Sequence, residues 1–317
     1  MGKFSISSPT HTPHTPDAAA KVSENKPKGL SSPANGRDSF DYSTATPKMQ
    51  RQHLNPNDIP RPVANYAPPE ELRNGFPGQK PGTLSPNQTG EINNAAQLGQ
   101  FVKAGYNKGE HGPVSIVPAT LHQGETSKPI HLVGISGTES VSGQSTGWGT
   151  NFKIGTEQSN AGKRNAREAL LQALPNGGDV VLAGHSQGGM VAQQLAASKT
   201  LKNAGINVMN TVTFGSPPIA AGQRNGEVHR ITARFDPVPY ASIDTLGVVP
   251  QLDQQRIGSN YGLNGIKAHS NEYFNEANPR LTSMDAMGRK NPAEPSRITF
   301  DPKDRVFFTS PGKTEAK

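Results

Sequence analysis

The 317-residue chain contains no cysteine. This absence excludes disulfides, thiolate metal sites and a cysteine nucleophile, and it says little about the redox compartment. The chain also lacks any run of about 18 apolar residues, so no transmembrane helix is expected. Its first residues, Met1–Ser8, contain no apolar stretch, so we expect no Sec-type signal peptide there.

Apolar residues are scarce as well. They make up 32% of the chain, and the mean hydropathy is −0.64, so part of the chain is expected not to pack into a core. Residues 1–90 hold 14 of the 28 prolines, together with many Ser, Thr and Asn residues. We interpret this stretch as a disordered N-terminal region for secretion or targeting. Its histidines, His11, His14 and His53, show no convergent metal ligands.

The charge of the chain is basic but diffuse. The net charge is +7 and the isoelectric point is about 9.5, yet the densest cluster is only Lys163, Arg164 and Arg167. A nucleic-acid site is therefore not expected, whereas an anionic membrane surface remains a possible partner.

Residues 91–317 show the alternation of helices and strands that is typical of an α/β fold. Apolar residues at helical spacing predict helices over residues 91–107, 162–174 and 188–205. Continuous apolar runs predict strands over residues 128–137, 179–184, 206–215 and 227–235. Such strands favour a largely parallel sheet covered by helices on both faces. After about residue 278, the stretch SRITFDPKDRVFF suggests a terminal hairpin.

One stretch, VVLAGHSQGGMVAQQLAAS at residues 180–198, places a serine between glycines where a strand should end and a helix begin. A nucleophile elbow is such a turn, and it needs small neighbours because a Cβ atom would strike the adjacent turn. Gly184, Gly188 and Gly189 meet that need around Ser186. The N–H of Gln187 would then supply one half of an oxyanion hole. A glycine-rich turn or a phosphate cradle is the alternative.

A serine nucleophile needs a base, and the base needs an orienting acid. In enzymes built around a nucleophile elbow the chain order is serine, then Asp or Glu, then histidine. Asp236 directly follows a predicted strand, and Pro237 and Pro239 stiffen the loop behind it. Asp244 and Asp253 are competitors in looser sequence. We favour Asp236 because a strand end holds a side chain more firmly than a mobile loop does.

His269 is the one histidine that follows the candidate acid in the chain, so the order rule selects it as the base. The alternative is a surface histidine in a loop. His185 lies beside the serine, but successive residues across a tight turn face apart. His229 lies inside a predicted strand, and His122 and His131 precede the serine.

With these residues placed, residues 91–276 resemble the class 3 lipase family, the fungal-lipase-like branch of the α/β hydrolases. The resemblance rests on the nucleophile elbow and on the segments TVTFGSPPIA, FDPVP, HSNEY and HLVGISGTESVSGQSTGWGTNF. It implies an α/β-hydrolase fold and a Ser186–Asp236–His269 triad. It also implies that Thr138 supplies the second oxyanion donor.

The chain departs from this family in three places. Ser136 stands where the family often has Arg before Gly-Thr, and Pro218 stands where it often has Arg after Gly-x-Pro. The segment at 139–160, where many relatives carry an apolar lid, is rich in Gly, Ser, Thr, Gln and Asn. An apolar lid and a preference for triglyceride droplets are therefore not expected.

These residues predict a serine esterase of the lipase class that acts on phospholipids or other acyl esters, with no metal and no organic cofactor. An acyl-protein thioesterase, a peptidase or another triad hydrolase is one alternative. A non-catalytic binding protein on the same fold is another. The expected partners are the acyl ester substrate and a peripheral membrane surface.

The proline-rich head on a cysteine-free hydrolase is typical of a substrate of a specialised, non-Sec secretion system, such as a bacterial effector delivered into a host cell. A secretion chaperone that binds the head is then a further expected partner. A cytoplasmic enzyme with a solvated tail is the alternative. Gly2 suggests N-myristoylation, but Ile6 stands where the motif has Ser or Thr.

Overall fold

The computed structural model describes residues 60–63, 84–106, 112–137, 162–219, 224–240, 254–290 and 292–309. All of them belong to one unit of the chain, Tyr42–Lys317. Thr138, the segment at 139–160, Asp244, Asp253 and most of the first 90 residues lie outside these ranges. The predictions made for them, including the targeting role of the head and the absence of a lid, stay predictions.

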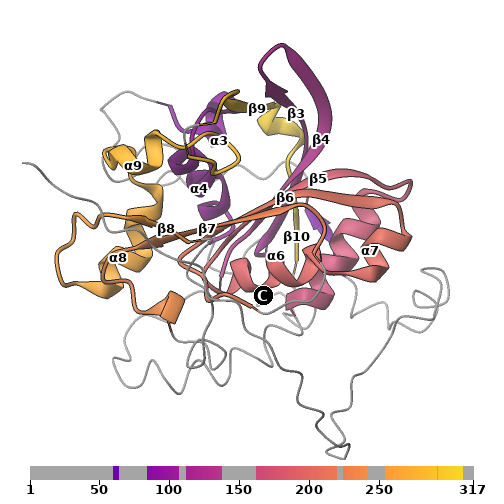
Figure 1. Cartoon of the computed structure of the whole chain (residues 1–317). Helices are drawn as coiled ribbons and strands as arrows, with labels where there is room; N and C mark the ends of the chain where they lie inside the picture. Colours follow the sequence, from indigo (N-terminus) through magenta and orange to yellow (C-terminus); the bar gives the residue numbers. More distant parts are fainter. Residues whose placement is uncertain are drawn as a thin grey trace, which may run out of the picture. The chain divides into compact units, whose positions relative to one another are not determined.

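The described residues form a ten-stranded sheet with the order β1-β10-β3-β4-β5-β6-β7-β8 (Figure 1). Strands β2 (Glu91–Ile92) and β9 lie off this path and pair with each other. Neighbouring strands from β4 to β8 are parallel. These strands are β4 (Thr126–Ile135), β5 (Gly178–His185), β6 (Ile206–Phe214), β7 (Glu227–Ala233) and β8 (Gln254–Ile257). Four of the five correspond to strands expected from the sequence, and β8 was not expected.

The other side of the sheet is antiparallel, which corrects the expectation of a largely parallel sheet. Strand β3 (Val114–Gln123) has no counterpart among the expected strands. Only Gly124 and Glu125 separate β3 from β4, and a two-residue connection can join antiparallel strands but not parallel ones. Strand β10 also runs antiparallel to β3, and β1 (Pro62–Val63) runs antiparallel to β10. The sheet is therefore mixed.

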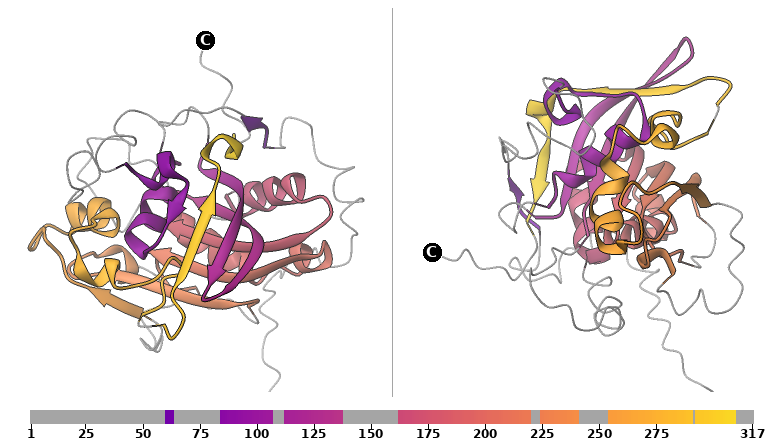
Figure 2. Two further views of the ribbon diagram at one scale, coloured as in Figure 1. Left: turned by 90° about the horizontal axis from the view of Figure 1, so that it is seen from above. Right: turned by 90° about the vertical axis from the view of Figure 1, so that its left-hand side faces the viewer.

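The expected terminal hairpin does not form. β9 (Ser296–Phe300) and β10 (Val306–Phe308) do not pair with each other; both pair antiparallel with β3, on two successive parts of that strand. Figure 2 shows β9, in yellow, running beside the β3–β4 hairpin. Between β9 and β10 the chain makes one short 3-10 turn, η6 (Pro302–Asp304), and then continues in the same direction. A hairpin needs a reversal, and this turn does not provide one.

Helices cover both faces of the sheet, as expected (Figure 1). One face carries a helix described over residues 162–173, α6 (Gln187–Ala196) and α7 (Lys199–Asn203). The other carries α4 (Ala95–Lys103), α9 (Pro279–Thr282) and the 3-10 turn η5 (Glu272–Phe274). The single helix expected over residues 188–205 is two helices, because Ser198 caps α7 by accepting a hydrogen bond from the Leu201 N–H.

The side chains of β5 show how the strand serves two cores. Val180 and Leu182 belong to the cluster under α6 and α7, whereas Val181 and Ala183 belong to the cluster under α4. Successive side chains of a strand point to opposite faces, so a strand covered on both sides must be apolar throughout. The continuous apolar run before Gly184 therefore holds the turn at Ser186 between two packed layers.

Packed structure begins earlier than the expected boundary near Glu91. The short helix α3 (Pro86–Thr89) carries a capping box between Ser85 and Gln88. Asn87 is buried and accepts a hydrogen bond from the Arg305 guanidinium. The Pro62–Val63 strand pairs with β10, so these parts of the first 90 residues pack on the sheet. Composition did not reveal them because each is short and rich in proline or asparagine.

Candidate active site

Ser186 occupies the turn between β5 and α6. Its backbone has φ 55° and ψ −126°, and it stands at the N-cap of α6. A positive φ is strained for a residue with a Cβ atom, and it persists only where the surroundings over-determine it. The Ser186 N–H donates to the Phe214 carbonyl at 2.9 Å, which ties the turn to the end of β6. The side chain is half-buried, so a solute can approach the hydroxyl.

The glycines around Ser186 are required by close backbone approach. A Cβ atom on Gly184 would lie 2.5 Å from the Gly188 carbonyl oxygen, and one on Gly188 would lie 2.1 Å from the Ile135 carbonyl oxygen. Both distances are below any tolerable contact, so larger residues would displace the backbone. The expectation that the elbow needs small residues at these positions agrees with this geometry.

Asp236 lies just beyond the carboxyl end of β7. It is 1% exposed, and its Oδ1 accepts a hydrogen bond from the Val238 N–H at 2.9 Å. Phe235, the residue before it, has a φ of 68°, which turns the chain sharply where the strand stops. The strand end and the turn therefore direct the carboxylate inward, below the surface.

His269 brings the other two residues together. It lies in α8 (Gly265–Asn271), whose N-cap Asn264 accepts from the Lys267 N–H at 3.0 Å. Its Nε2 is 3.0 Å from the Ser186 Oγ, and its Nδ1 is 2.9 Å from the Asp236 Oδ2. Hydroxyl, imidazole and carboxylate thus form one hydrogen-bonded chain, in which the imidazole can accept the hydroxyl proton while the carboxylate orients it.

Tyr273 is a fourth member of this cluster. It is fully buried, and its hydroxyl donates to the Asp236 Oδ2 at 2.5 Å and accepts from the Ala233 N–H at 2.8 Å. Burial, followed by the negative charge of Asp236, raises the pKa of Tyr273 well above its ordinary value. The hydroxyl therefore stays protonated and donates to the carboxylate. This tyrosine ends the segment HSNEY, and its position four residues after His269 is the one signal for it in the sequence.

Of the two expected oxyanion donors, one lies within the described residues. Gln187 is the first residue of α6 and directly follows Ser186, so its N–H belongs to the helix N-terminus beside the hydroxyl. Thr138 lies outside the described ranges. Its neighbour Gly137 is close to the elbow, since a Cβ atom on Gly137 would be 2.9 Å from the Ser186 Cβ.

His185 takes no part in a contact with the serine hydroxyl, as expected from the turn. Its Nδ1 lies 2.5 Å from the Tyr106 hydroxyl, and its Nε2 lies 3.0 Å from the His269 carbonyl oxygen. Burial, followed by the charges of His269 and Lys103, lowers the pKa of His185 well below its ordinary value. Sequence reasoning missed these contacts, because Tyr106 and His185 are 79 positions apart.

The remaining candidate histidines lie elsewhere. His229 is half-buried in β7 and contacts Glu227 at 3.2 Å. His122 lies on β3 and contacts Ser127 on β4 and Thr299 on β9. Among the described residues, no three His, Asp or Glu side chains are grouped so that they could hold a metal ion. Within the same residues, every helix is too short or too polar to cross a bilayer.

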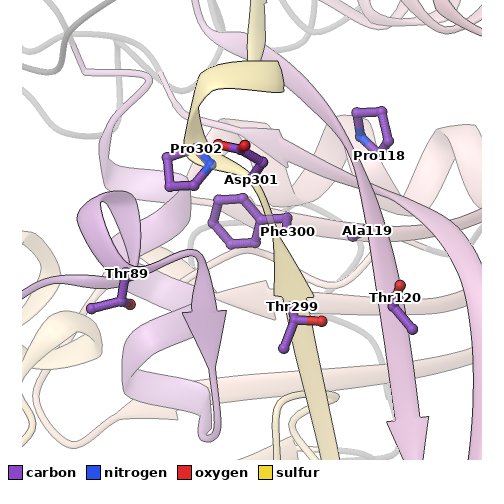
Figure 3. A pocket seen from close by; sticks show the side chains of 8 residues that line it. All are labelled: Thr89, Pro118, Ala119, Thr120, Thr299, Phe300, Asp301 and Pro302. Atoms are coloured by element: carbon purple, nitrogen blue, oxygen red, sulfur yellow. The ribbon is translucent and has the colours of Figure 1, made fainter.

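A surface pocket of about 590 Å³ lies away from this cluster (Figure 3). Its lining residues come from β3, β9, α3 and the start of η6: Thr89, Pro118, Ala119, Thr120, Thr299, Phe300, Asp301 and Pro302. None of them belongs to the serine, histidine and aspartate cluster. Most of the lining side chains are proline, threonine and phenylalanine, and Asp301 is the one titratable group among them. We therefore expect a catalysed reaction at the turn around Ser186 and not in this pocket.

No protein family matches the sequence, and no curated protein matches it either. Among solved structures the chain is similar to the Lip2 lipase from Yarrowia lipolytica, with 17% identity and a TM-score of 0.25, over 44% of this chain and 65% of that one. It is also similar to a lipase from Rhizopus microsporus var. chinensis, with 14% identity and a TM-score of 0.30, over 55% of this chain and 79% of that one. The chain thus spans less than two thirds of the Lip2 lipase.

Membership of the class 3 lipases therefore stays a prediction. The described residues form a mixed sheet with helices on both faces, and a fold alone does not determine a function.

Proposed function

We propose that the chain is a serine esterase of the lipase type, which cleaves carboxylic esters through Ser186, His269 and Asp236. The single observation that carries the proposal is the hydrogen-bonded chain from the Ser186 Oγ through the His269 imidazole to the Asp236 Oδ2, at 3.0 and 2.9 Å. Its location supports the same conclusion, because the serine stands on a strained strand-to-helix turn and the order is serine, aspartate, histidine.

In the proposed reaction the Ser186 Oγ attacks the ester carbonyl carbon while the His269 Nε2 takes the hydroxyl proton. The imidazolium then gives that proton to the departing alkoxide oxygen, which leaves an acyl group on Ser186. Water attacks the acyl carbon, His269 takes a proton from it, and that proton returns to the Ser186 Oγ as the acid departs. Asp236 accepts the Nδ1–H bond throughout and stabilises the imidazolium.

The oxyanion of each tetrahedral intermediate is assigned to backbone donors beside the serine. The Gln187 N–H is one, and the Thr138 N–H is the other by the resemblance described above. One such donor contributes about 2.7–4 kcal/mol to transition-state stabilisation in comparable enzymes.

The surface beside the site supports an ester that is presented at a lipid surface. Leu263 and Ile266, just before His269, are 85% and 54% exposed. Phe235 is also exposed, and it adjoins this segment because a Cβ atom on Gly265 would lie 2.6 Å from the Phe235 carbonyl oxygen. Large exposed apolar side chains that are grouped together mark an interaction site more often than side chains that are scattered singly over the surface.

The charges around these side chains favour an anionic surface. The Arg234 guanidinium lies 4.9 Å from the centre of the Phe235 ring, and Arg256 and Lys267 are exposed nearby. Within the described stretches 234–240 and 254–271 the one carboxylate is Asp236, which is buried. We therefore propose phospholipid in an anionic bilayer as the natural context of the substrate.

The activity is tested with the purified chain on matched ester, thioester and amide substrates that carry the same acyl group. Hydrolysis of the ester by the wild type, lost in Ser186→Ala with an unchanged melting temperature, is the expected result. Asp236→Asn should lower kcat about 10⁴-fold, because asparagine favours the wrong imidazole tautomer, as the same change does in serine proteases. Asp244→Asn serves as the aspartate control and should stay close to wild type. A preference for the thioester or amide would favour the rival hydrolases, and no turnover of any of the three would favour a binding protein.

The lipid context is tested by co-sedimentation with vesicles of phosphatidylcholine alone or with added phosphatidylserine. A Leu263→Asn/Ile266→Asn chain should bind less than wild type, and binding should rise with the anionic lipid and fall with salt. Leu84→Asn is the matched control, since Leu84 is an exposed leucine outside this surface. Equal binding of the wild type and the double variant would remove the assignment.

A further inference from the structure

A hydrogen-bond path runs through His185, the residue before the candidate nucleophile, and joins two parts of the site that the triad does not join. The Gly137 N–H donates to the Tyr106 hydroxyl at 2.8 Å. The same hydroxyl is 2.5 Å from the His185 Nδ1, and the His185 Nε2 is 3.0 Å from the His269 carbonyl oxygen. The path starts at Gly137 after β4, passes through Tyr106 and His185, the residue before Ser186, and ends on the backbone of the candidate base.

The chemistry of these groups determines which atom donates at each step. A carbonyl oxygen can only accept, so the His185 Nε2 must carry a proton. A neutral imidazole then has a bare Nδ1, and the Tyr106 hydroxyl must donate to it. The lone pairs of that hydroxyl are left to accept from Gly137. The path is thus satisfied when His185 is neutral and protonated on Nε2.

We propose that Tyr106 and His185 are positioning residues for the ester hydrolysis: together they hold Gly137, the residue before the expected oxyanion donor Thr138, at a set distance from the backbone of His269. This inference rests on the proposed function. Neither side chain is placed against the reacting atoms. Both act through the residues that they hold, Gly137 on one side and His269 on the other.

Burial and close packing support a positioning role. His185 is 3% exposed, and its ring centre lies 4.6 Å from that of His269. A Cβ atom on Gly137 would lie 2.7 Å from the Tyr106 hydroxyl, so the turn fits directly against the tyrosine. The groups are therefore held with little freedom, and a displacement at one end of the path is transmitted to the other.

The charge on His185 also bears on the base beside it. During the reaction His269 becomes an imidazolium, and a second cation stacked against it would raise the cost of that step. The titratable groups of the described residues that face His185 are His269 from α8, Tyr273 from η5, Tyr106 after α4 and Lys103 at the end of α4. Burial, followed by the charges of His269 and Lys103, lowers the pKa of His185, which keeps the ring neutral.

The distinguishing variants are Tyr106→Phe, His185→Gln and His185→Leu, made in the full chain. Tyr106→Phe keeps the ring and removes the hydroxyl that bridges Gly137 and His185. His185→Gln keeps one acceptor and one donor on a side chain that cannot become charged, whereas His185→Leu keeps neither. Tyr261→Phe is the control for the loss of a tyrosine hydroxyl elsewhere in the chain.

The readout is kcat and KM on a soluble nitrophenyl ester across pH, with the melting temperature of each variant. Tyr106→Phe should lower kcat about 10-fold with little change in KM, since one hydrogen bond of positioning is worth roughly that factor. His185→Leu should lower kcat about 100-fold, because a small misplacement of a catalytic group reduces the rate by roughly that factor. His185→Gln should recover most of the loss, and its kcat should fall less at acid pH than that of the wild type.

Two results would overturn the inference. One is a Tyr106→Phe chain with wild-type kcat, and the other is a His185→Gln chain no better than His185→Leu. If the wild type cleaves no ester, the proposed function fails, and the path is then read from the ¹⁵N spectrum of the imidazoles. A neutral His185 protonated on Nε2 supports the hydrogen-bond path, and protonation on Nδ1 or a cation overturns it.

Discussion

The Tyr273 hydroxyl lies 2.5 Å from the Asp236 Oδ2, the same carboxylate oxygen that faces the His269 Nδ1 at 2.9 Å. One oxygen of the buried carboxylate therefore accepts two hydrogen bonds, and the other accepts one from the Val238 N–H. Three donors around one buried carboxylate fix its orientation. A glycine makes room for this arrangement, since a Cβ atom on Gly215 would lie 2.8 Å from the Asp236 Oδ2.

The first prediction is that Tyr273→Phe lowers both stability and turnover. A hydrogen bond to a charged group contributes about 1.5–3 kcal/mol, and the variant also leaves the buried Ala233 N–H without its acceptor. We expect a loss of about 2–3 kcal/mol in the free energy of unfolding, measured by urea denaturation, and a drop in kcat of about 10-fold. Tyr261→Phe is the control. An unchanged unfolding midpoint in Tyr273→Phe would contradict the contact.

The second prediction concerns the strain at Ser186. Ser186→Ala and Ser186→Gly both remove the hydroxyl and should both be inactive, but only glycine removes the Cβ atom at a φ of 55°. Glycine should therefore be more stable than alanine at this position by about 1 kcal/mol or more, even though it is the more flexible residue when unfolded. The comparison of the two melting temperatures measures this. Alanine equal to or above glycine would mean that the turn is relaxed.

A third prediction follows from the lowered pKa of His185. The folded chain holds this ring neutral, whereas the unfolded chain protonates it below its ordinary pKa of 6.5. Below that pH the unfolded state binds more protons than the folded state. The contribution of His185 to the free energy of unfolding is therefore complete above pH 6.5 and is lost as the pH falls below it. His185→Gln removes this contribution.

The measurement is the urea midpoint of wild type and His185→Gln at a series of pH values. His131, whose pKa burial also lowers, is present in both chains, so the difference between them isolates His185. The midpoint of the wild type should decline more steeply on acidification than that of the variant. Parallel declines would show that His185 does not change protonation on unfolding.

The three residues of the candidate site could be predicted because each follows a local rule. Ser186 stands in a glycine turn after an apolar strand, Asp236 ends another strand, and His269 is the one histidine beyond it. Parallel strands bring their carboxyl ends to one edge of a sheet, so such residues converge in space although they are far apart in sequence. Four of the five parallel strands, β4 to β7, were predictable from their apolar runs, whereas β8 was not.

The antiparallel half was not predictable from local pattern. Pro118 lies inside β3, and proline counts against a strand. It is tolerated there because it lies between the parts of β3 that pair with β9 and with β10. The path through Tyr106 and His185 was equally hidden, since it depends on contacts between segments that only the folded sheet brings together. Pairing across a sheet has no periodic signal in a single strand.

The fourth prediction concerns where the chain can be shortened. A chain that begins at Glu91 loses α3, and with it the Asn87 side chain, which accepts from the buried Arg305 guanidinium at 2.6 Å. Arg305 also donates to the Phe101 carbonyl and the Ser115 hydroxyl, and it is 5% exposed, so it cannot turn outward without breaking the packing beneath β10. A hydrogen bond to a buried charged group contributes about 1.5–3 kcal/mol, so this chain should melt below wild type.

A chain that begins just before Pro60 keeps the Asn87 contact and the pairing of Pro62–Val63 with β10. Its melting temperature should therefore equal that of the full-length chain, and it should cleave a soluble ester at the same rate. Asn87→Leu in the full chain should reproduce the loss seen on cutting at Glu91, because leucine fills the space without an acceptor, whereas Asn87→Asp should retain stability by supplying a charged one. If cutting at Glu91 left the melting temperature unchanged, or if Asn87→Leu were as stable as wild type, the packed part of the chain would begin after α3 and Arg305 would need a different partner.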